Sequence, residues 1–489
     1  MDHKGAQYTD RPVETARRTA DANNDVHQHV QPTPDLTAHI GGGAVDTFLP
    51  VPVALDHVGK ELLANVFQTN YQRPHRDDWF TVGLHDQSTS LQVLANSVMH
   101  FQGFRDVDGI PQQSKLATIY YQLAVKSMRK RLAKLQDNGV LVQHSRRPIT
   151  KQDPRTSKEI DALIGTAAAF ICYTDIASLK EEWILHLTGL LHLVKLREGG
   201  LERLGPHLRS TISWVELRGA FVYDVPPRLP LPTAWMERYR SNRTRSLLYH
   251  LVVSTAIADI RRGWTTRFPD EGSKLWLSIF EDLARFSWLA EEDFTIAVVG
   301  EPGRILPEWT EVLLHRLLRI PQQFSLMETV IGGAHRSTLE TDILAEACRL
   351  GCLLFLAPLW RKYEVTPVPT VVLLRKQSGL LKLLSLDGGQ PLEPWLLNLL
   401  FWVLCISALE TVTYAASSNT PAGSAEAEAL TRRLISALAS VAACMGIPLG
   451  QRQRVEAAMK RILWVDNVFD SSLERLTQYA QIRLTSQSG

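Results

Sequence analysis

Two hydrophobic stripes with helical spacing follow each other closely between Trp183 and Val222. The first stripe consists of Trp183, Leu187, Leu190, Leu191 and Val194, and the second of Leu208, Ile212, Val215, Gly219 and Val222. Such spacing places each set on one face of an α-helix. Gly199 and Gly200 favour a stop between the two helices, because glycine adopts the left-handed conformation without steric cost. We therefore expect a packed helical hairpin, in which Gly219 lets a neighbouring helix approach closely.

The same periodicity extends over most of the chain beyond residue 45 and predicts an all-α fold. We expect a large multi-helix domain of packed antiparallel helices, without the fixed repeat of a solenoid. The β-prone runs at residues 295–299 and 370–374 are too isolated to build a sheet. Besides the hairpin, helices are predicted at residues 57–68, 88–104, 112–136, 157–178, 308–319, 337–363, 368–386, 393–416, 424–445 and 451–484.

The composition of the chain and the positions of its prolines indicate the domain organisation. Residues 1–44 are polar, with six acidic and four basic side chains, and end beside a run of glycines, which predicts a disordered tail with a net charge of −2. Residues 45–489 form the helical domain. Four prolines between residues 226 and 232 cannot continue a helix and predict a possible subdomain break near residues 224–236. Residues 300–307 form a second break.

The overall composition is that of a globular protein, with 45% hydrophobic and 21% charged residues. The formal net charge of +2 provides no general electrostatic attraction to nucleic acid or to an anionic membrane. Residues 394–409 are uncharged but too short to span a bilayer, which favours a buried core helix. The five cysteines lie in apolar helical contexts and the N-terminus lacks the apolar run of a signal peptide, so we expect a soluble intracellular protein with reduced thiols.

Three blocks of the sequence resemble one known family. HLTGLLHLVKLREGGLERLG followed by ISWVELRGAF is similar to the core signature of the fungal-specific transcription factor domain, the helical regulatory region of fungal zinc-cluster transcription factors. ILWVDNVFDSSLERL resembles the closing motif of that family, and PWLLNLLFWVLCISALE its penultimate section. The resemblance covers roughly residue 45 to the C-terminus. It implies a nuclear regulator of transcription, with the transcription machinery or a zinc-cluster factor as partner and a small-molecule effector as a further possibility.

The DNA-reading module of that family has no counterpart in this chain. Zinc-cluster factors hold two zinc ions with six closely spaced cysteines, whereas residues 1–44 contain no cysteine. Cys348 and Cys352 share a helix face, but without a second ligand pair they are predicted to be core residues. We therefore predict no metal or cofactor site, and we expect no direct DNA binding by this chain.

The sequence contains no recognisable catalytic motif, so we predict no catalytic residues. One alternative rests on Asp466, Asp470 and Glu474, which lie on one helix face and could hold magnesium against a diphosphate, as in all-helical terpene cyclases. Such enzymes need a second acidic helix, for which residues 77–78 and 291–293 are the nearest candidates. A solvated acidic face is the favoured interpretation.

Several other motifs allow both a functional and a structural interpretation, and the structural one is favoured each time. The basic run at residues 126–134 is interpreted as a solvated helix face rather than a nuclear localisation signal. Glu216 and Arg218 are interpreted as ties between helices rather than as a functional pair. The run PPRLPLP is interpreted as a crossover rather than a peptide ligand. His186 and His192 lie on different helix faces, and the histidines of the tail lack ligand spacing.

Three hypotheses remain. The preferred one is a fungal transcription-regulatory protein that acts through its helical domain. The second is an interaction protein that joins a zinc-cluster factor without contacting DNA. The third, remote, is a helical metal-dependent enzyme.

Overall fold

The structure is a computed structural model, and it describes residues 53, 57, 59–60, 78, 81–83, 86–102, 115–138, 153–245, 255–269, 271–295, 305–320, 336–363, 368–383, 392–417 and 421–487. Regular secondary structure in these residues is helical throughout, with no strand, so the all-α prediction is confirmed. The predicted tail at residues 1–44 and residues 61–68 of the helix predicted at residues 57–68 lie outside the described residues. The defined elements are α3 (Gln87–Gln102), α4 (Lys115–Asp137), α6 (Pro154–Ile176), α7 (Lys180–Leu196), η1 (Gly200–Arg203), α8 (Pro206–Tyr223), α9 (Thr233–Arg245), α10 (Thr255–Arg267), α11 (Glu271–Thr295), α12 (Ile305–Leu318), α13 (Arg336–Tyr363), α14 (Val371–Leu383), α15 (Pro394–Ser417), α16 (Pro421–Cys444), α17 (Arg452–Lys460) and α18 (Asp466–Gln487).

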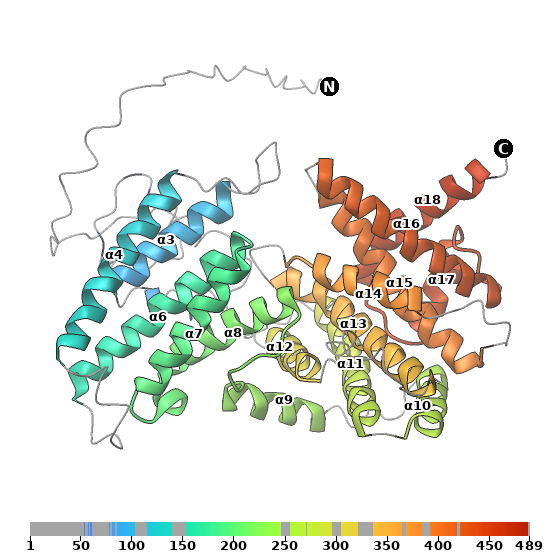
Figure 1. Cartoon of the computed structure of the whole chain (residues 1–489). Helices are drawn as coiled ribbons and strands as arrows, with labels where there is room; N and C mark the ends of the chain where they lie inside the picture. The colour runs from blue at the N-terminus through green and yellow to red at the C-terminus, as the bar shows by residue number, and fades with distance from the viewer. Residues whose placement is uncertain are drawn as a thin grey trace, which may run out of the picture.

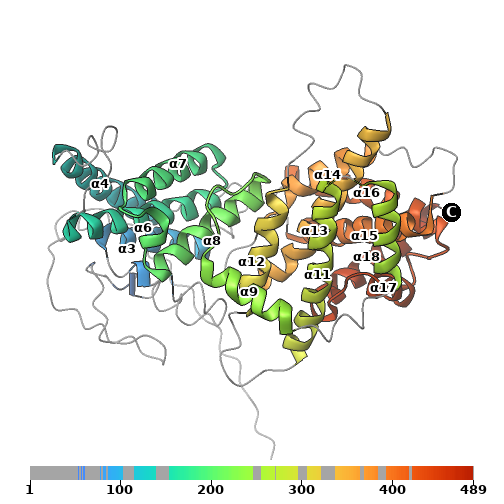
Figure 2. The ribbon, with the colours of Figure 1, turned by 90° about the horizontal axis from the view of Figure 1, so that it is seen from below.

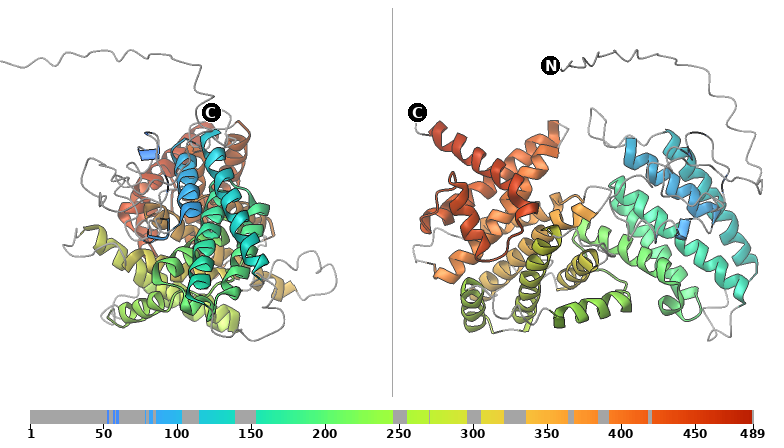
Figure 3. Two further views of the ribbon diagram at one scale, coloured as in Figure 1. Left: turned by 90° about the vertical axis from the view of Figure 1, so that its left-hand side faces the viewer. Right: turned by 180° about the vertical axis from the view of Figure 1, so that it is seen from behind.

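The helices gather in two groups along the molecule (Figure 1). Helices α3, α4, α6, α7 and α8 form one side, and α10, α11 and α13 to α18 form the other. Helices α9 and α12 lie between them, and the view from below shows the same order (Figure 2). Views from the side and from behind show that the two groups follow each other along one axis rather than lying one on top of the other (Figure 3). The C-terminal end of α8 therefore points toward the second group.

Helix α6 is the centre of the first group. It begins at Pro154, whose missing N–H is not needed in a first turn, and the side chain of Asp153 accepts a hydrogen bond from the backbone N–H of Thr156 at 3.4 Å. Every residue from Leu163 to Asp175 is buried. Because α3, α7 and α8 all pack on it, α6 has no solvated face along most of its length.

The two predicted stripes are confirmed, but the hairpin is built differently from the expectation. In α7 and α8 the stripe residues are buried, apart from Leu191, which is partly buried against the core. However, the two helices pack mainly on α6 and only slightly on each other. The glycine stop is also displaced. Helix α7 already ends at Leu196, and Gly199 and Gly200, with φ of 74° and 56°, form the left-handed turn that follows.

Where α7 and α8 do touch, Gly219 makes the contact possible. A Cβ atom built on Gly219 would lie 2.1 Å from Nε1 of Trp183, far inside van der Waals contact. The indole of Trp183 thus rests on the bare backbone of α8, and its ring also faces Tyr223 with 5.3 Å between the centroids. The close approach predicted for Gly219 is confirmed.

The second group is built around α13 and α15. Both helices are long and apolar enough to cross a membrane, but 89% and 78% of the respective windows are buried inside the protein. This burial confirms the interpretation of residues 394–409 as part of a core helix. A continuous series of ring contacts joins α10, α11, α13, α15 and α18, through Trp264, Trp276, Phe280, Trp402, Phe355, Phe469 and Trp464.

One helix prediction is corrected, and three helices were missed. Residues 451–484 form two helices and not one, because Ile462, Leu463, Trp464 and Val465 are all buried and four consecutive side chains cannot share one helix face. Residues 371–374 form the first turn of α14, as the helix predicted at residues 368–386 required. Helices α9, α10 and α11 were not predicted individually. By contrast, residues 224–232 are non-helical, as the prolines indicated.

We expect Gly219→Ala to lower the free energy of unfolding by roughly 2–3 kcal/mol, because the added methyl overlaps the indole of Trp183 and forces the helices apart. Gly189→Ala in α7 is the matched control. No atom lies within 4 Å of a Cβ at that position, so the higher helix propensity of alanine should stabilise the protein by up to about 1 kcal/mol. Chemical denaturation measures both changes. Equal effects at the two glycines would contradict the proposed role of the Trp183 contact.

Candidate functional site

Charged side chains that are almost fully buried gather on and around α8. Glu216 lies on its inner surface, and its two carboxylate oxygens accept the backbone N–H groups of Arg228 at 2.5 Å and Leu229 at 2.8 Å. Burial raises the pKa of Glu216, and the two N–H groups oppose that rise. The carboxylate thereby holds the proline-rich segment after α8 against the helix.

Arg218, also on α8, is paired across the first group. Its Nη1 lies 2.7 Å from Oδ2 of Asp175 on α6, and both side chains are nearly inaccessible to solvent. Burial raises the pKa of Asp175, and the charge of Arg218 opposes that rise. The interpretation of Glu216 and Arg218 as ties between neighbouring segments is therefore confirmed.

Asp224 forms a charged contact between the two groups of helices. It follows the last residue of α8 in the left-handed conformation, with φ of 48°, and its side chain is fully buried. Its carboxylate accepts two parallel hydrogen bonds from Arg349 on α13, from Nη1 and Nη2, each 3.0 Å long. Lys376 on α14 donates to the same carboxylate. We call Asp224, Arg349, Glu346 and Lys376 the junction cluster.

The junction cluster is balanced in charge. Arg349 also donates to Glu346 on its own helix, at 2.7 Å from Nε and 2.6 Å from Nη2, so all of its donor edges face carboxylates. Burial disfavours the charged form of Asp224, but Arg349 and then Lys376 outweigh this effect and hold the pKa of Asp224 below its ordinary value. Paired in this way, the charges can remain ionised inside the protein.

A second buried carboxylate joins α9 and α12, which lie between the two groups, to α11 of the second group. Asp282 on α11 accepts hydrogen bonds from the hydroxyl of Tyr239 on α9 at 2.7 Å and from Nη1 of Arg316 on α12 at 2.6 Å. Its side chain is fully buried. Asp282 thus ties α9, α11 and α12 together.

Two of the three carboxylates of the acidic stripe on α18, Asp466 and Asp470, are paired with cations of the chain itself. Lys460 and the indole N–H of Trp464 donate to Asp466, at 2.9 Å and 2.7 Å. Arg452 lies 3.2 Å from Asp470. Asp78, from the proposed second acidic site, lies beside His207, whereas the side chains of Asp77 and residues 291–293 lie outside the described part of the structure. No group of three or more metal-ligating side chains is found among the described residues.

The cysteines and histidines considered in the sequence as possible metal ligands have structural roles or lie apart. Cys348 and Cys352 are buried, and desolvation raises the pKa of both thiols. His186 stacks on Phe170 with 5.2 Å between the ring centroids, while His192 is exposed, so the two lie on different faces as predicted.

The basic run on α4 is largely solvated, as predicted. Lys126, Arg129 and Lys130 are exposed, whereas Arg131 pairs with Asp86 and Glu159. The PPRLPLP segment is pinned to α8 through Glu216, which fits a crossover better than a free peptide ligand.

Sequence reasoning missed the junction cluster. Asp224 was interpreted only as the start of a subdomain break or crossover, and Arg349 was not singled out within the helix predicted at residues 337–363. A signal existed, since an arginine flanked by Cys348 and Leu350 in the middle of a core helix must be buried and therefore needs a carboxylate partner. Which carboxylate it needs cannot be read from local sequence.

Comparison with known proteins supports the resemblance over the first group of helices. Residues 56–223 match the family model described as fungal specific transcription factor domain. No curated protein and no solved structure matches the chain. The matched stretch contains the first of the three blocks that resemble the family, so the resemblance is confirmed there. For the penultimate and closing blocks it remains a prediction.

We expect Asp224→Asn to lower the free energy of unfolding by about 3–5 kcal/mol at neutral pH, because Arg349 loses a buried charge partner. Asparagine tolerates the left-handed backbone, so the change isolates the charge from the fold of the turn. The exposed pair of Arg375 and Glu426 provides the control: Glu426→Gln should cost less than about 1 kcal/mol.

The difference in free energy of unfolding between wild type and Asp224→Asn should also depend on pH. The folded-state pKa of Asp224 lies below its ordinary value of 3.8, so the stabilisation is fully present above pH of about 4 and is lost as the pH falls through the lowered pKa. The denaturation midpoints of the two proteins should therefore draw closer together as the pH falls from neutral to about 3. A constant difference over this range would contradict the role of the ionised carboxylate.

Proposed function

We propose, from the fungal specific transcription factor domain matched by residues 56–223, that this protein regulates transcription. The observation that supports the proposal best is the coincidence of that match with a structural unit. The matched stretch ends at Tyr223, which is also the last residue of α8 and of the first group of helices. In this proposal the protein acts in the nucleus.

The junction cluster suggests how the matched region works with the rest of the chain. Asp224, the first residue after the match, is held by Arg349 and Lys376 from the second group of helices. A displacement of α13 or α14 would pull directly on the end of α8. We propose that the second group controls the first through this contact, and that the first group presents the surface that other regulatory proteins recognise.

In this proposal the chain acts through protein partners, either the transcription machinery or a zinc-cluster factor, and not through a DNA contact of its own. The formal net charge of +2 over 489 residues supports this choice, because it provides no general electrostatic attraction to nucleic acid.

A second candidate function is that of a dedicated partner of a zinc-cluster factor. The outer face of α7 favours it, because Leu185 is 67% exposed and Ile184 38% exposed inside the region that matches the family. The backbone at Gly189 is also open, with nothing within 4 Å of a Cβ there. A partner helix could pack closely on this face.

The chain fused to an unrelated DNA-binding module should change the expression of a reporter gene in a fungal cell. Asp224→Asn should reduce the change, whereas Glu426→Gln should not, since only the former breaks the contact between the two groups of helices. A wild-type fusion that is present in the nucleus but leaves the reporter unaffected would refute the proposal.

Capture experiments distinguish the two candidates. If the chain is a dedicated partner, Leu185→Glu should abolish its co-purification with a zinc-cluster factor from fungal nuclei. Ile482→Glu is the matched control, because Ile482 is 69% exposed on α18, outside the matched region. Loss of capture with both variants, or with neither, would count against the α7 face.

A further inference from the structure

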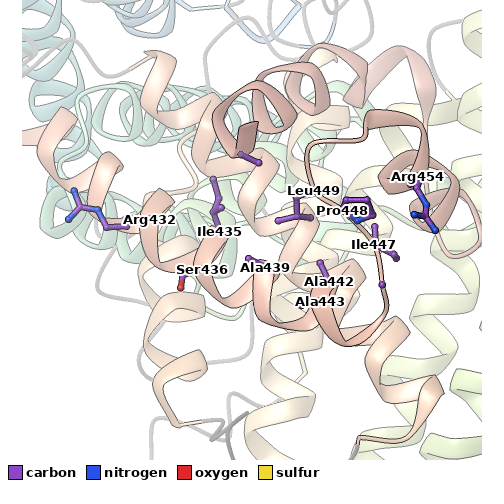
Figure 4. A pocket seen from close by; sticks show the side chains of 12 residues that line it. Arg432, Ile435, Ser436, Ala439, Ala442, Ala443, Ile447, Pro448, Leu449 and Arg454 are labelled. Carbon is purple, nitrogen blue, oxygen red and sulfur yellow. The ribbon is translucent and has the colours of Figure 1, made fainter. Parts of the chain in front are cut away.

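A cavity of about 580 Å³ lies at the C-terminal end of α16, between that helix, the loop that follows it, α17 and α18. Figure 4 shows its lining as a row of short apolar side chains with an arginine toward each end. It lies in the second group of helices, outside the stretch that matches the family. Neither the junction cluster nor the exposed face of α7 includes this cavity.

Small residues create the cavity, and a defined turn holds it open. Ala439, Ala442 and Ala443 line it from α16, where larger side chains would fill the space. The loop begins with Gly446 at φ of 64°, and the N–H of Ile447 donates to the carbonyl of Ala442 at 2.9 Å, which is a helix-ending hydrogen-bond pattern. The wall is therefore part of the fold and does not depend on a ligand for its shape.

The other end of the loop is fixed as well. Nε2 of Gln481 on α18 donates to the carbonyl of Gly450 at 2.8 Å. The loop is thus held by α16 at its beginning and by α18 at its end. Preformed cavities of a few hundred Å³ with apolar walls and few polar groups are typical of small-molecule sites.

The chemistry of the lining selects a type of ligand. The floor is apolar and buried, formed by Ile435, Ala442, Leu449 and Ala480. The polar groups of the lining are Ser436, Arg432 and Arg454. Arg432 is already paired with Glu428 on its own helix at 2.7 Å.

Arg454 is the available cation. On α17, Arg452 pairs with Glu456 and Asp470, and Lys460 pairs with Glu456 and Asp466. Among the described residues Arg454 has no such ion pair. A guanidinium at the edge of an apolar floor matches a ligand with an anionic head and an apolar body, and its planar fork suits a carboxylate.

We propose that this cavity binds a small apolar monocarboxylic acid, with the carboxylate on Arg454 and the apolar body on the floor formed by Ile435, Ala442 and Leu449. Binding requires only the folded chain, so the proposal goes beyond the role in transcription and does not depend on it. Because the ligand would bridge α16, the loop and α17, it should also stabilise this end of the second group.

The test uses the full-length chain and two probes of equal chain length, decanoate and decanol, below the concentration at which decanoate forms micelles. Calorimetric titration should show that decanoate binds at least about tenfold more tightly than decanol, because only decanoate provides a charged hydrogen-bond acceptor. Arg454→Gln should remove this preference and leave the affinity for decanol unchanged. Arg433→Gln, an exposed arginine of α16 outside the lining, should leave both affinities unchanged.

A second variant tests the cavity itself. Ala439→Leu places a larger side chain at an exposed position of the lining, so the protein should fold normally while both probes lose affinity. Decyl phosphate distinguishes carboxylate recognition from general anion binding, and equal or tighter binding of this probe would overturn the assignment of a carboxylate. No binding of decanoate to the wild type, or equal binding of decanoate and decanol, would overturn the proposal.

Discussion

The fold depends on the cost of removing charge from water. Arg349 and Asp224 are almost completely buried, and each ion would lose several kcal/mol of hydration without a partner in a favourable position. Their two parallel hydrogen bonds require the end of α8 and the middle of α13 to keep one relative position. The region that matches the family is therefore attached to the rest of the chain by directional contacts, and not by apolar packing alone. Apolar packing tolerates small sliding movements, whereas this pair does not.

Close helix packing also limits how the helices are arranged. In both groups of helices, a tryptophan ring packs on a glycine of a neighbouring helix. Gly219 on α8 accommodates the indole of Trp183, and Gly263 on α10 accommodates that of Trp395, with a Cβ at the latter glycine 2.4 Å from the ring. In each case the largest side chain lies on the smallest residue of a neighbouring helix. Dispersion contacts over a whole indole ring then hold the two helices at short distance. A change at either partner affects the spacing of two helices at once.

Local pattern predicted most of the helices, because helical periodicity is a property of neighbouring residues. The buried positions of α7 and α8 and the close approach at Gly219 followed from spacing alone. Helix α9 was missed because it is mostly polar and buries Trp235 and Tyr239 through contacts with α12 that the local sequence does not reveal. The candidate site was only half predicted. Glu216 and Arg218 were expected to tie α8 to neighbouring segments. Their partners, and the whole junction cluster, depend on which helices meet in space.

The distance along the chain between Asp224 and its partners also determines when these residues can first meet during synthesis. Asp224 is 125 residues from Arg349 and 152 from Lys376, so its partners leave the ribosome long after the family-matched region has emerged. Until then the end of α8 carries an unpaired carboxylate and an uncovered apolar surface. The matched region thus passes through an interval in which its later contact surface is open to chaperones or to other chains. The rate of translation between residues 224 and 376 sets the length of that interval.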